Sequence, residues 1–361
     1  MSLRIIIAGG GTGGHLFPGI AIANELIKKN KKNKILFVTS GKDIDKNILY
    51  EHGFKSVKLT IEGIKGKKIV SKIRSGLKIP KAIIESFIIL KKFKPDIVIG
   101  VGGYSSGPII LMAYFLGIKT AIQEQNSIPG ITNKILSLFV DRIYISFKDY
   151  KNIFNPSKTL LTGNPVRNSI LNSINEIKKD DSSRFSILVM GGSQGAHAIN
   201  MAVIESLNFI RDSQKFFFIH QSGQRDELTV KKSYDRLNFF ADVKPFFKDM
   251  KSAYNQADLL ICRAGATTIS EITVLGKPAI FIPFPFAADN HQFYNALEFL
   301  QKGACKIILE EDLSGKLIAE IIEYYCVNRE KLKIMASKAK EFAFPNSAND
   351  IVNDCYKLVG L

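Results

Sequence analysis

The residues near the start of this chain that could do chemistry are those of GGGTGGH, residues 9–15. This segment directly follows the apolar run 5–8, which is typical of a buried strand. Glycines at the end of a parallel strand expose backbone N–H groups to an anion, and the start of the next helix favours negative charge. The pattern therefore predicts that a phosphate or diphosphate binds at this turn, with the imidazole of His15 beside it.

The same pattern returns in the second half of the chain. MGGSQGAH, residues 190–197, again follows an apolar run and ends in a histidine, and VGGYSSGP at 101–108 is a third glycine-rich turn. One such turn alone is equally expected of a plain tight turn. Matched turns at strand ends favour ligand binding, because ligands of open α/β sheets bind at the carboxyl ends of the strands.

Two familiar phosphate motifs do not explain the first turn. Residues 9–14 spell G-x-G-x-x-G, but the next predicted strand ends in Thr39-Ser40, without the acidic residue that would hold a dinucleotide ribose. The glycines also lead into His15, whereas a P-loop requires a lysine. Asp43 and Asp45 resemble a metal-chelating Asp-x-Asp pair, but acids at the start of a helix are expected simply from capping and the helix dipole, so no metal site is predicted.

The second half carries a denser group of polar residues. CRAGATTISE, residues 262–271, follows a predicted strand and contains Arg263 and Glu271. Glu271 could accept hydrogen bonds from a ribose diol, or it could simply favour the helix dipole from near the start of a helix. DNHQ, residues 289–292, follows the next predicted strand, so Gln292 is a candidate ligand contact.

Alternating strand-like and helix-like segments fill the chain and predict an α/β protein with parallel sheets. The polar stretch 171–184 is expected to join two similar halves, 19–30 and 81–93 to be helical, and a last helix to begin after Pro345. The predicted strands lie within 4–9, 34–40, 96–103, 119–125, 142–147, 185–190, 215–223, 243–247, 257–265 and 277–285.

Composition and charge limit the possible classes of protein. The chain has 361 residues, 50 Lys and Arg against 33 Asp and Glu, and a net charge of +17. This surplus favours a polyanionic partner, although an overall bias toward lysine would also produce it. The four scattered cysteines form no C-x-x-C pair and indicate a reducing compartment. The apolar stretch at the start is too short for a signal peptide, and the longest apolar segments elsewhere are too short for a membrane span.

Seven motifs, taken together, resemble the MurG family of UDP-N-acetylglucosamine transferases. The resemblance extends from residue 5 to about residue 345, with the motifs in the family's order. At two positions the chain departs from the family pattern: Gln123 stands where a histidine often precedes Glu-Gln-Asn, and His291 stands where some members have a glutamine. The motifs are GGGTGGHLFPG, VGGYSSGP, QEQNSIPGITNK, TGNPVR, MGGSQGA, CRAGATTISE and DNHQ.

The resemblance implies a GT-B fold, in which two Rossmann-like domains face a central cleft. It implies a domain over 1–164 for the acceptor and the membrane, a UDP-sugar domain over 165–343, and a C-terminal helix over 344–361 that can cross back to the first domain. It also implies an inverting transfer of N-acetylglucosamine from UDP-N-acetylglucosamine to the 4-hydroxyl of undecaprenyl-diphosphate-linked N-acetylmuramyl-pentapeptide (lipid I), which completes lipid II for peptidoglycan synthesis. No metal or other cofactor is expected.

The resemblance also assigns residues to the two substrates. Among them, Arg167 would approach the donor phosphates, Glu271 the ribose, Phe247 the uracil, and Gln292 with Asn126 the sugar. The donor residues are Thr12, Gly13, Gly14, Asn126, Arg167, Ser193, Gln194, Gly195, Phe247, Arg263, Ala266, Thr267, Glu271 and Gln292. The acceptor residues are His15, Tyr104, Glu124 and Asn133.

The reaction needs a base for the attacking hydroxyl, and histidine titrates near neutral pH. His15 is therefore the candidate catalytic base. The alternative is that His15 only donates a hydrogen bond to a phosphate or orients the turn.

Residues 65–94 mix Lys and Arg with apolar residues. This segment predicts peripheral binding to an anionic surface on the cytoplasmic face of the inner membrane. We expect Ile83, Ile84, Phe87 and Ile88 to belong to the core, so that only the basic side chains would meet lipid.

Two other functions stay open at this point. The net charge would suit a nucleic-acid-binding protein, but no binding motif accompanies it, so no nucleic-acid partner is predicted. A UDP-N-acetylglucosamine epimerase or a glycolipid synthase of the same architecture is the stronger alternative. An epimerase would convert the sugar nucleotide without an acceptor, whereas a glycolipid synthase would accept diacylglycerol.

Overall fold

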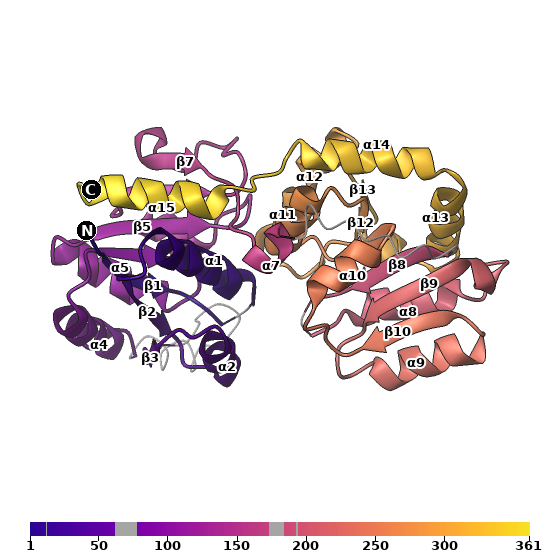
Figure 1. Cartoon of the computed structure of the whole chain (residues 1–361), viewed down its shortest axis with the longest axis horizontal. Coiled ribbons are helices and arrows are strands. Elements are labelled where there is room, and N and C mark those ends of the chain that lie inside the picture. The colour runs from indigo at the N-terminus through magenta and orange to yellow at the C-terminus, as the bar shows by residue number, and fades with distance from the viewer. Residues whose placement is uncertain (12, 62–77, 173–183, 193) are drawn as a thin grey trace. The chain divides into compact units, whose positions relative to one another are not determined.

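The chain divides into two compact units, shown in a computed structural model that describes residues 1–11, 13–61, 78–172, 184–192 and 194–361 (Figure 1). The N-terminal unit comprises Met1–Arg167 together with Phe344–Leu361, and the C-terminal unit comprises Asn168–Ala343. The first boundary thus precedes the polar stretch 171–184, of which residues 173–183 lie outside the described part.

The N-terminal unit is built on a seven-stranded parallel sheet with the order β3-β2-β1-β4-β5-β6-β7. Its central strands are short and apolar, and β1 is buried from Ile5 to Ala8. Strands buried on both faces are typical of parallel sheets that helices cover on both sides. The strands are β1 (Arg4–Ala8), β2 (Lys34–Thr39), β3 (Ser56–Lys58), β4 (Ile97–Gly100), β5 (Lys119–Glu124), β6 (Arg142–Ile145) and β7 (Thr159–Leu161).

The last helix of the chain packs in the N-terminal unit, beside α1 (Figure 1). Ile351 and Val352 belong to the apolar core of this unit, and the hydroxyl of the buried Tyr144 donates to Asp354 Oδ2 at 2.9 Å. The helices of the unit are α1 (Gly13–Lys29), α2 (Asp43–Glu51), α4 (Lys78–Phe93), α5 (Ser106–Phe115), α6 (Ile131–Leu136) and α15 (Ser347–Leu358), with the 3₁₀ turn η1 (Pro156–Lys158).

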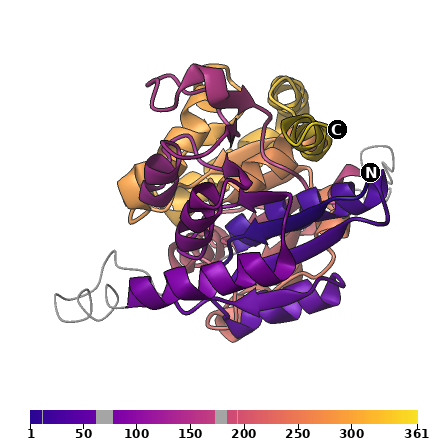
Figure 2. The ribbon, with the colours of Figure 1, turned by 90° about the vertical axis from the view of Figure 1, so that its left-hand side faces the viewer.

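Helix α4 lies on the outside of the N-terminal unit (Figure 2). Ala82 and Leu90, eight residues apart, are buried on one face of this helix, because residues four apart in a helix share a face. On the other face, Ile84, Phe87 and Ile88 are 61%, 41% and 56% exposed. The expectation that these three side chains belong to the core is therefore wrong, and Ile83 is only half-buried.

The C-terminal unit has a six-stranded parallel sheet with the order β10-β9-β8-β11-β12-β13. One predicted strand is displaced, because β10 ends at Lys244, before Pro245, which has no N–H to donate to a sheet. The strands are β8 (Phe185–Met190), β9 (Phe216–Gln221), β10 (Phe240–Lys244), β11 (Leu259–Cys262), β12 (Ala279–Phe281) and β13 (Lys306–Ile307).

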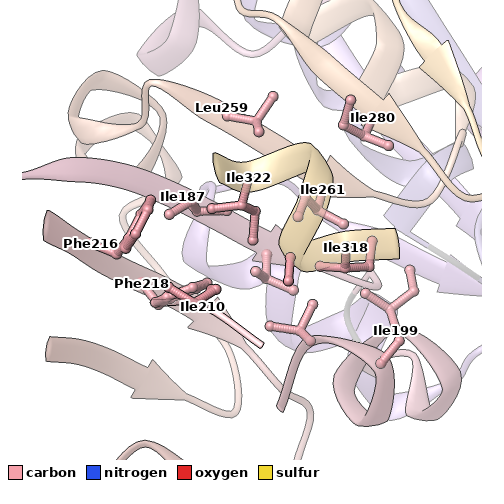
Figure 3. Packing of buried hydrophobic residues seen from close by; sticks show 14 of the residues in the cluster. Ile187, Ile199, Ile210, Phe216, Phe218, Leu259, Ile261, Ile280, Ile318 and Ile322 are labelled. Atoms are coloured by element: carbon pink, nitrogen blue, oxygen red, sulfur yellow. The ribbon is translucent and has the colours of Figure 1, made fainter. Parts of the chain in front are cut away.

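The core of the C-terminal unit forms where Ile187 and Ile261 of the sheet meet Ile318 and Ile322 of helix α13 (Figure 3). Two parallel α/β units confirm the fold class predicted from the strand and helix pattern. The helices of this unit are α7 (Asn168–Leu171), α8 (His197–Ser206), α9 (Glu227–Arg236), α10 (Met250–Gln256), α11 (Ala266–Leu275), α12 (His291–Gln301), α13 (Gly315–Val327) and α14 (Arg329–Lys340). Its 3₁₀ turns are η2 (Ser213–Lys215), η3 (Ala288–Asn290) and η4 (Glu310–Asp312).

Candidate functional site

The first glycine-rich turn connects β1 to α1 and is held by an acidic residue that sequence reasoning had assigned to helix capping or a metal. The N–H of Gly11 donates to both carboxylate oxygens of Asp45, at 3.1 and 2.9 Å, and Lys42 Nζ donates to Gly11 O at 3.1 Å. Asp45 is buried, and burial raises the pKa of its carboxyl. Asp45 is thus part of the turn. The described residues contain no group of three His, Cys, Asp or Glu side chains placed to hold a metal.

His15 lies on the first turn of α1 and is half-buried. Its Nδ1 is 3.0 Å from Oε1 of Gln125, which directly follows β5. Tyr104, from the turn between β4 and α5, is 44% exposed. Gly13 and Gly14 begin α1, whereas Thr12, the remaining donor residue predicted in this turn, lies outside the described residues.

Glu124, Asn126 and Asn133 meet one another in the N-terminal unit. Glu124 is buried, and its carboxylate accepts the N–H of Asn126 at 2.9 Å, the N–H of Gly130 at 3.1 Å and Asn133 Nδ2 at 2.8 Å. These bonds hold the segment from the end of β5 to the first turn of α6. Glu124 and the buried Asn133, both predicted to meet the acceptor, are therefore engaged in holding this segment in place.

In the C-terminal unit, the second glycine-rich turn packs closely against the backbone that follows β9. Gly195 has a φ of +77°, and a Cβ added there would lie 2.1 Å from Ser222 O, so only glycine fits without a shift of the backbone. Gln194 lies in the same turn, and Ser193 lies outside the described residues.

A buried amide that sequence reasoning missed connects this turn to the segment predicted to meet uracil. Gln221 is 3% exposed, its Nε2 donates to Gly192 O at 2.8 Å, and its Oε1 accepts the N–H of Phe247 at 3.0 Å. Phe247 is itself buried, with Lys244 Nζ 4.9 Å from its ring centroid. One side chain therefore holds the backbone of the predicted diphosphate turn and of the predicted base-binding segment.

We predict that Gln221→Leu weakens binding of the sugar nucleotide that the family resemblance implies. The buried N–H of Phe247 and the partly buried carbonyl of Gly192 would lose their partner, and an unpaired buried group costs about 1–3 kcal/mol where the loop cannot relax. We therefore expect KM for UDP-N-acetylglucosamine to rise about tenfold, with a smaller change in kcat. Steady-state kinetics check this, with Gln256→Leu as the control because that amide is exposed on α10 of the same unit. Equal KM values for the two variants would contradict the prediction.

Arg263 directly follows β11, and Glu271 lies little more than one turn into α11, as the sequence predicts. The two side chains differ in how far they are already engaged in other contacts. Glu271 is buried and accepts the hydroxyl hydrogen of the buried Tyr254 at 2.9 Å, so Tyr254 orients its carboxylate. Arg263 forms an ion pair with Glu310 at 2.5 Å and donates from Nη1 to two backbone carbonyls. Its guanidinium is therefore mainly engaged in holding this part of the fold.

Ala266 and Thr267 open helix α11, whose preceding residue, Gly265, provides no side-chain cap. The first N–H groups of such a helix favour an anion. Gln292 lies in the first turn of α12, and its Oε1 accepts the N–H of Phe284 at 3.0 Å. Arg167, predicted to approach the donor phosphates, belongs to the N-terminal unit, where its guanidinium carbon lies 4.7 Å from the ring centroid of Phe17.

Comparison with known proteins agrees with the architecture and the motifs. Residues 5–145 match the glycosyltransferase family 28 N-terminal domain, and residues 186–351 match the glycosyltransferase family 28 C-terminal domain. A protein of Syntrophus aciditrophicus (strain SB) is 47% identical over 362 residues, which cover 100% of both chains. That protein is named UDP-N-acetylglucosamine–N-acetylmuramyl-(pentapeptide) pyrophosphoryl-undecaprenol N-acetylglucosamine transferase.

Solved structures show the same relationship. The crystal structure of Acinetobacter baumannii MurG has a TM-score of 0.79 and 30% sequence identity, covering 98% of this chain and 99% of that one. The UDP-GlcNAc 2-epimerase of Neisseria meningitidis has a TM-score of 0.70 over 99% of this chain and 100% of that one, but its 16% identity shows a likeness of fold alone. The chain therefore belongs to the MurG family within glycosyltransferase family 28, and it has the GT-B fold of that family.

Proposed function

We propose that this protein transfers N-acetylglucosamine from UDP-N-acetylglucosamine to the 4-hydroxyl of undecaprenyl-diphosphate-linked N-acetylmuramyl-pentapeptide, with inversion at the anomeric carbon. The observation that carries the proposal is the 47% identity over the full length of a transferase named for this reaction. The glycine-rich turns support it, because each follows a buried parallel strand and leads to a helix start, an arrangement suited to a diphosphate.

In the proposed reaction, His15 Nε2 takes the proton of the 4-hydroxyl. The oxygen attacks the anomeric carbon, and the bond from that carbon to the UDP oxygen breaks. The departing diphosphate carries the negative charge that develops. Backbone N–H groups of the second glycine-rich turn are the proposed groups that stabilise this charge, and Arg167 is a separate candidate for the same role. The carboxylate of Glu271, oriented by Tyr254, would accept hydrogen bonds from the hydroxyl groups of the ribose.

Labelled UDP-N-acetylglucosamine with a short-chain lipid-linked muramyl peptide tests the proposal directly. We expect label in the lipid-linked disaccharide and release of UDP, both dependent on the acceptor. Conversion of the sugar nucleotide without an acceptor would instead indicate an epimerase. Transfer to diacylglycerol in place of the muramyl peptide would indicate a glycolipid synthase.

We also propose that the protein binds peripherally to the cytoplasmic face of the inner membrane through the surface of α4, α5 and α6. In the part of the chain that the structure describes, no helix combines the length and apolarity needed to cross a bilayer. The three neighbouring helices carry exposed apolar and basic side chains. This α4–α6 surface comprises Ile84, Phe87, Ile88, Tyr114, Phe115, Ile131, Ile135 and Leu138, with Lys81, Lys91, Lys92 and Lys134.

Apolar side chains mixed with lysines suit an interface with anionic lipid. The other part of the predicted membrane segment, residues 65–77, lies outside the described residues. Within the described part, α4 contributes both kinds of side chain, and Lys91 Nζ lies 5.6 Å from the ring centroid of Phe87. Burial of this face in the headgroup region would bring the enzyme to the bilayer that contains the lipid chain of the acceptor.

The double variant Lys91→Gln, Lys92→Gln is expected to bind anionic vesicles about 30-fold more weakly, because each basic residue near such a surface contributes about 1 kcal/mol. Flotation with vesicles containing anionic lipid measures the effect at low and high salt. The matched control is Lys231→Gln, Lys232→Gln, two lysines of α9 in the C-terminal unit. The proposal fails if both pairs behave alike, or if neutral vesicles retain the wild-type protein equally well.

A further inference from the structure

The two ring nitrogens of His15 have different surroundings. Nδ1 lies 3.0 Å from Gln125 Oε1, whereas the structure shows no hydrogen bond from Nε2 to any residue it describes. A neutral imidazole carries its proton on one nitrogen only, and the partner of one nitrogen decides which. The proton on His15 therefore depends on which end of the Gln125 amide faces the ring.

The orientation of that amide follows from its other contacts. Gln125 Nε2 donates to the carbonyl oxygen of Val101 at 2.8 Å and also to Oε1 of Gln123. Both of these atoms can only accept a hydrogen bond. A reversed amide would place Oε1 against two acceptors, so the nitrogen must face Val101 and Gln123, and Oε1 must face His15.

We infer that Gln125 is a positioning residue for the transfer reaction, because it keeps the proton of neutral His15 on Nδ1 and leaves the lone pair on Nε2. This inference rests on the proposed function for the role of His15 as the base. A histidine with the opposite tautomer could not take the proton of the acceptor hydroxyl through Nε2. Gln125 thus acts through His15 and need not contact either substrate.

Gln123, the residue that departs from the family pattern, supports this arrangement. Its side chain is fully buried, and its Nε2 donates to Ser146 Oγ and to Asn164 Oδ1, both at 3.1 Å. Its Oε1 therefore faces Gln125 and accepts from it. The amide of Gln125 is fixed by a chain of buried hydrogen bonds that ends in the core of the N-terminal unit.

Gly102 provides the space for the pair of side chains. A Cβ added at Gly102 would lie 2.6 Å from His15 Nδ1 and 3.3 Å from Gln125 Oε1, and the φ of this residue is +90°. A side chain at this position would force the imidazole and the amide apart. Gly102, in the third glycine-rich turn, is therefore needed to make room for the imidazole of His15, in addition to any role in binding an anion.

Nitrogen NMR of the ¹⁵N-histidine-labelled protein tests the inference without any need for activity. At a pH where His15 is neutral, we expect its Nδ1 to be of the protonated type and its Nε2 of the unprotonated type. The chain has five histidines, so the variant His15→Gln assigns the resonances of this ring. A protonated Nε2 on neutral His15 in the wild-type protein would overturn the inference.

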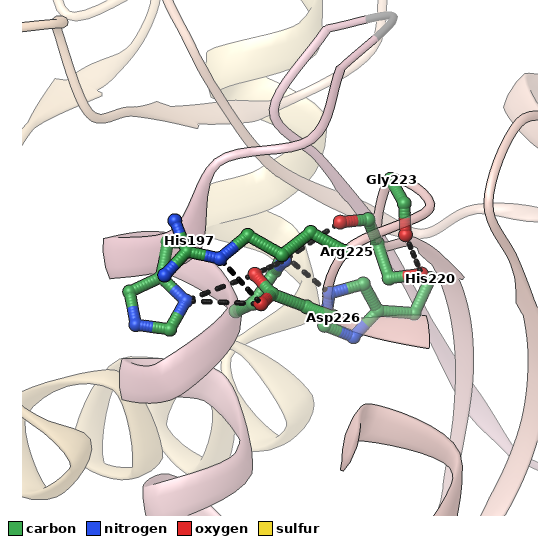
Figure 4. Close-up of polar contacts among 7 residues, drawn as sticks. His197, His220, Gly223, Arg225 and Asp226 are labelled. Carbon is green, nitrogen blue, oxygen red and sulfur yellow. Dashed lines mark hydrogen bonds and ion pairs between the residues drawn. The ribbon is translucent and has the colours of Figure 1, made fainter. Parts of the chain in front are cut away.

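His220 gives an internal reference with the opposite expectation (Figure 4). Asn200 Nδ2 donates to Ser222 O and to Asp226, so its Oδ1 must accept from His220 Nε2, while Nδ1 accepts from the hydroxyl of Tyr234. Burial lowers the pKa of His220 to about 3, so this ring stays neutral throughout. His15 and His220 should therefore show opposite tautomers in the same spectrum.

The variants Gln125→Met and Gln125→Glu separate positioning from packing. Methionine fills the space but accepts no strong hydrogen bond, so both tautomers of His15 should be populated and kcat should fall roughly tenfold, with KM for the donor little changed. Glutamate can accept from Nδ1 and should restore the wild-type tautomer. A carboxylate there would also favour the imidazolium, so the acid side of the kcat profile should move to higher pH.

Asp45 of α2 is coupled electrostatically to His15, and Lys42 contacts the same turn, so both remain unchanged in every variant. A Gln125→Met protein with the wild-type tautomer and the wild-type kcat would overturn the inference. If Gln125→Met does not fold, as judged by circular dichroism, two other measurements test the inference. These are the nitrogen NMR spectrum of the wild-type protein and the pH profile of kcat for Gln125→Glu. Full activity of His15→Gln would instead remove the base assignment and leave the tautomer result standing.

Discussion

Replacing His15 by glutamine is expected to lower kcat roughly 10²- to 10⁴-fold, the usual contribution of a general base. Glutamine keeps a polar side chain of similar reach, so the turn between β1 and α1 should retain its shape. Because His15 lies in the N-terminal unit and the proposed uracil and diphosphate contacts lie mainly in the C-terminal unit, UDP should bind with unchanged affinity. Steady-state kinetics with both substrates and calorimetry with UDP measure the two effects.

The result also separates the two roles considered for His15. If His15 only donates a hydrogen bond to the acceptor's phosphate, the substitution should raise KM for the acceptor and leave kcat nearly unchanged. His52→Gln is the control, since His52 is exposed just beyond α2 in the same unit. A kcat within about twofold of the control would show that His15 is not the base.

Replacing Arg167 by alanine is expected to lower kcat/KM for the donor about 100-fold, because the loss of one contact to developing negative charge typically costs about 3 kcal/mol. The cost to folding should be much smaller. Arg167 is half-buried, and its stacking on Phe17 is worth about 0.5–1 kcal/mol at such a site. Donor kinetics measure the change in kcat/KM, and urea unfolding of the same preparation measures the change in the free energy of unfolding.

Arg184→Ala is a matched control for Arg167→Ala. Arg184 is also half-buried and stacks on an aromatic ring, with its guanidinium carbon 3.7 Å from the ring centroid of Phe240, but no substrate role is proposed for it. Both variants should lose similar stability, and only Arg167→Ala should lose activity. Arg167→Lys should recover part of the activity, because it keeps the charge without the planar group. Equal activity in the two alanine variants would remove Arg167 from the donor site.

The strand-and-helix order of both units could be predicted from the sequence because it depends on local patterns. Short apolar runs that end in glycine predicted β1, β4 and β8, and each of these strands was found. Helix α1 begins at Gly13, earlier than the predicted residue 19, because a helix start within glycines has little periodicity to mark it. The edge strands β3, β7 and β13 were missed because each has only two or three residues, too few to show an alternating or apolar pattern.

The exposed face of α4 shows where local pattern was insufficient. Ile83, Ile84, Phe87 and Ile88 are as apolar as Ala82 and Leu90, so composition alone assigned all of them to a core. Only the packing of the helix separates the buried face from the exposed one. The sequence predicted that only the basic side chains of residues 65–94 would meet lipid. In the structure, the α4–α6 surface presents both basic and apolar side chains.

The sequence by itself determined the parallel α/β architecture, the glycine-rich turns at the strand ends and the family, because each is encoded in short contiguous segments. Tertiary structure alone decided which side chains support those segments. His15 meets Gln125 across 110 residues of sequence, Gly11 meets Asp45 across 34, and Gln221 connects Gly192 to Phe247. Such contacts depend on how distant strands are ordered in a sheet, and neither amide composition nor spacing along the chain carries that information.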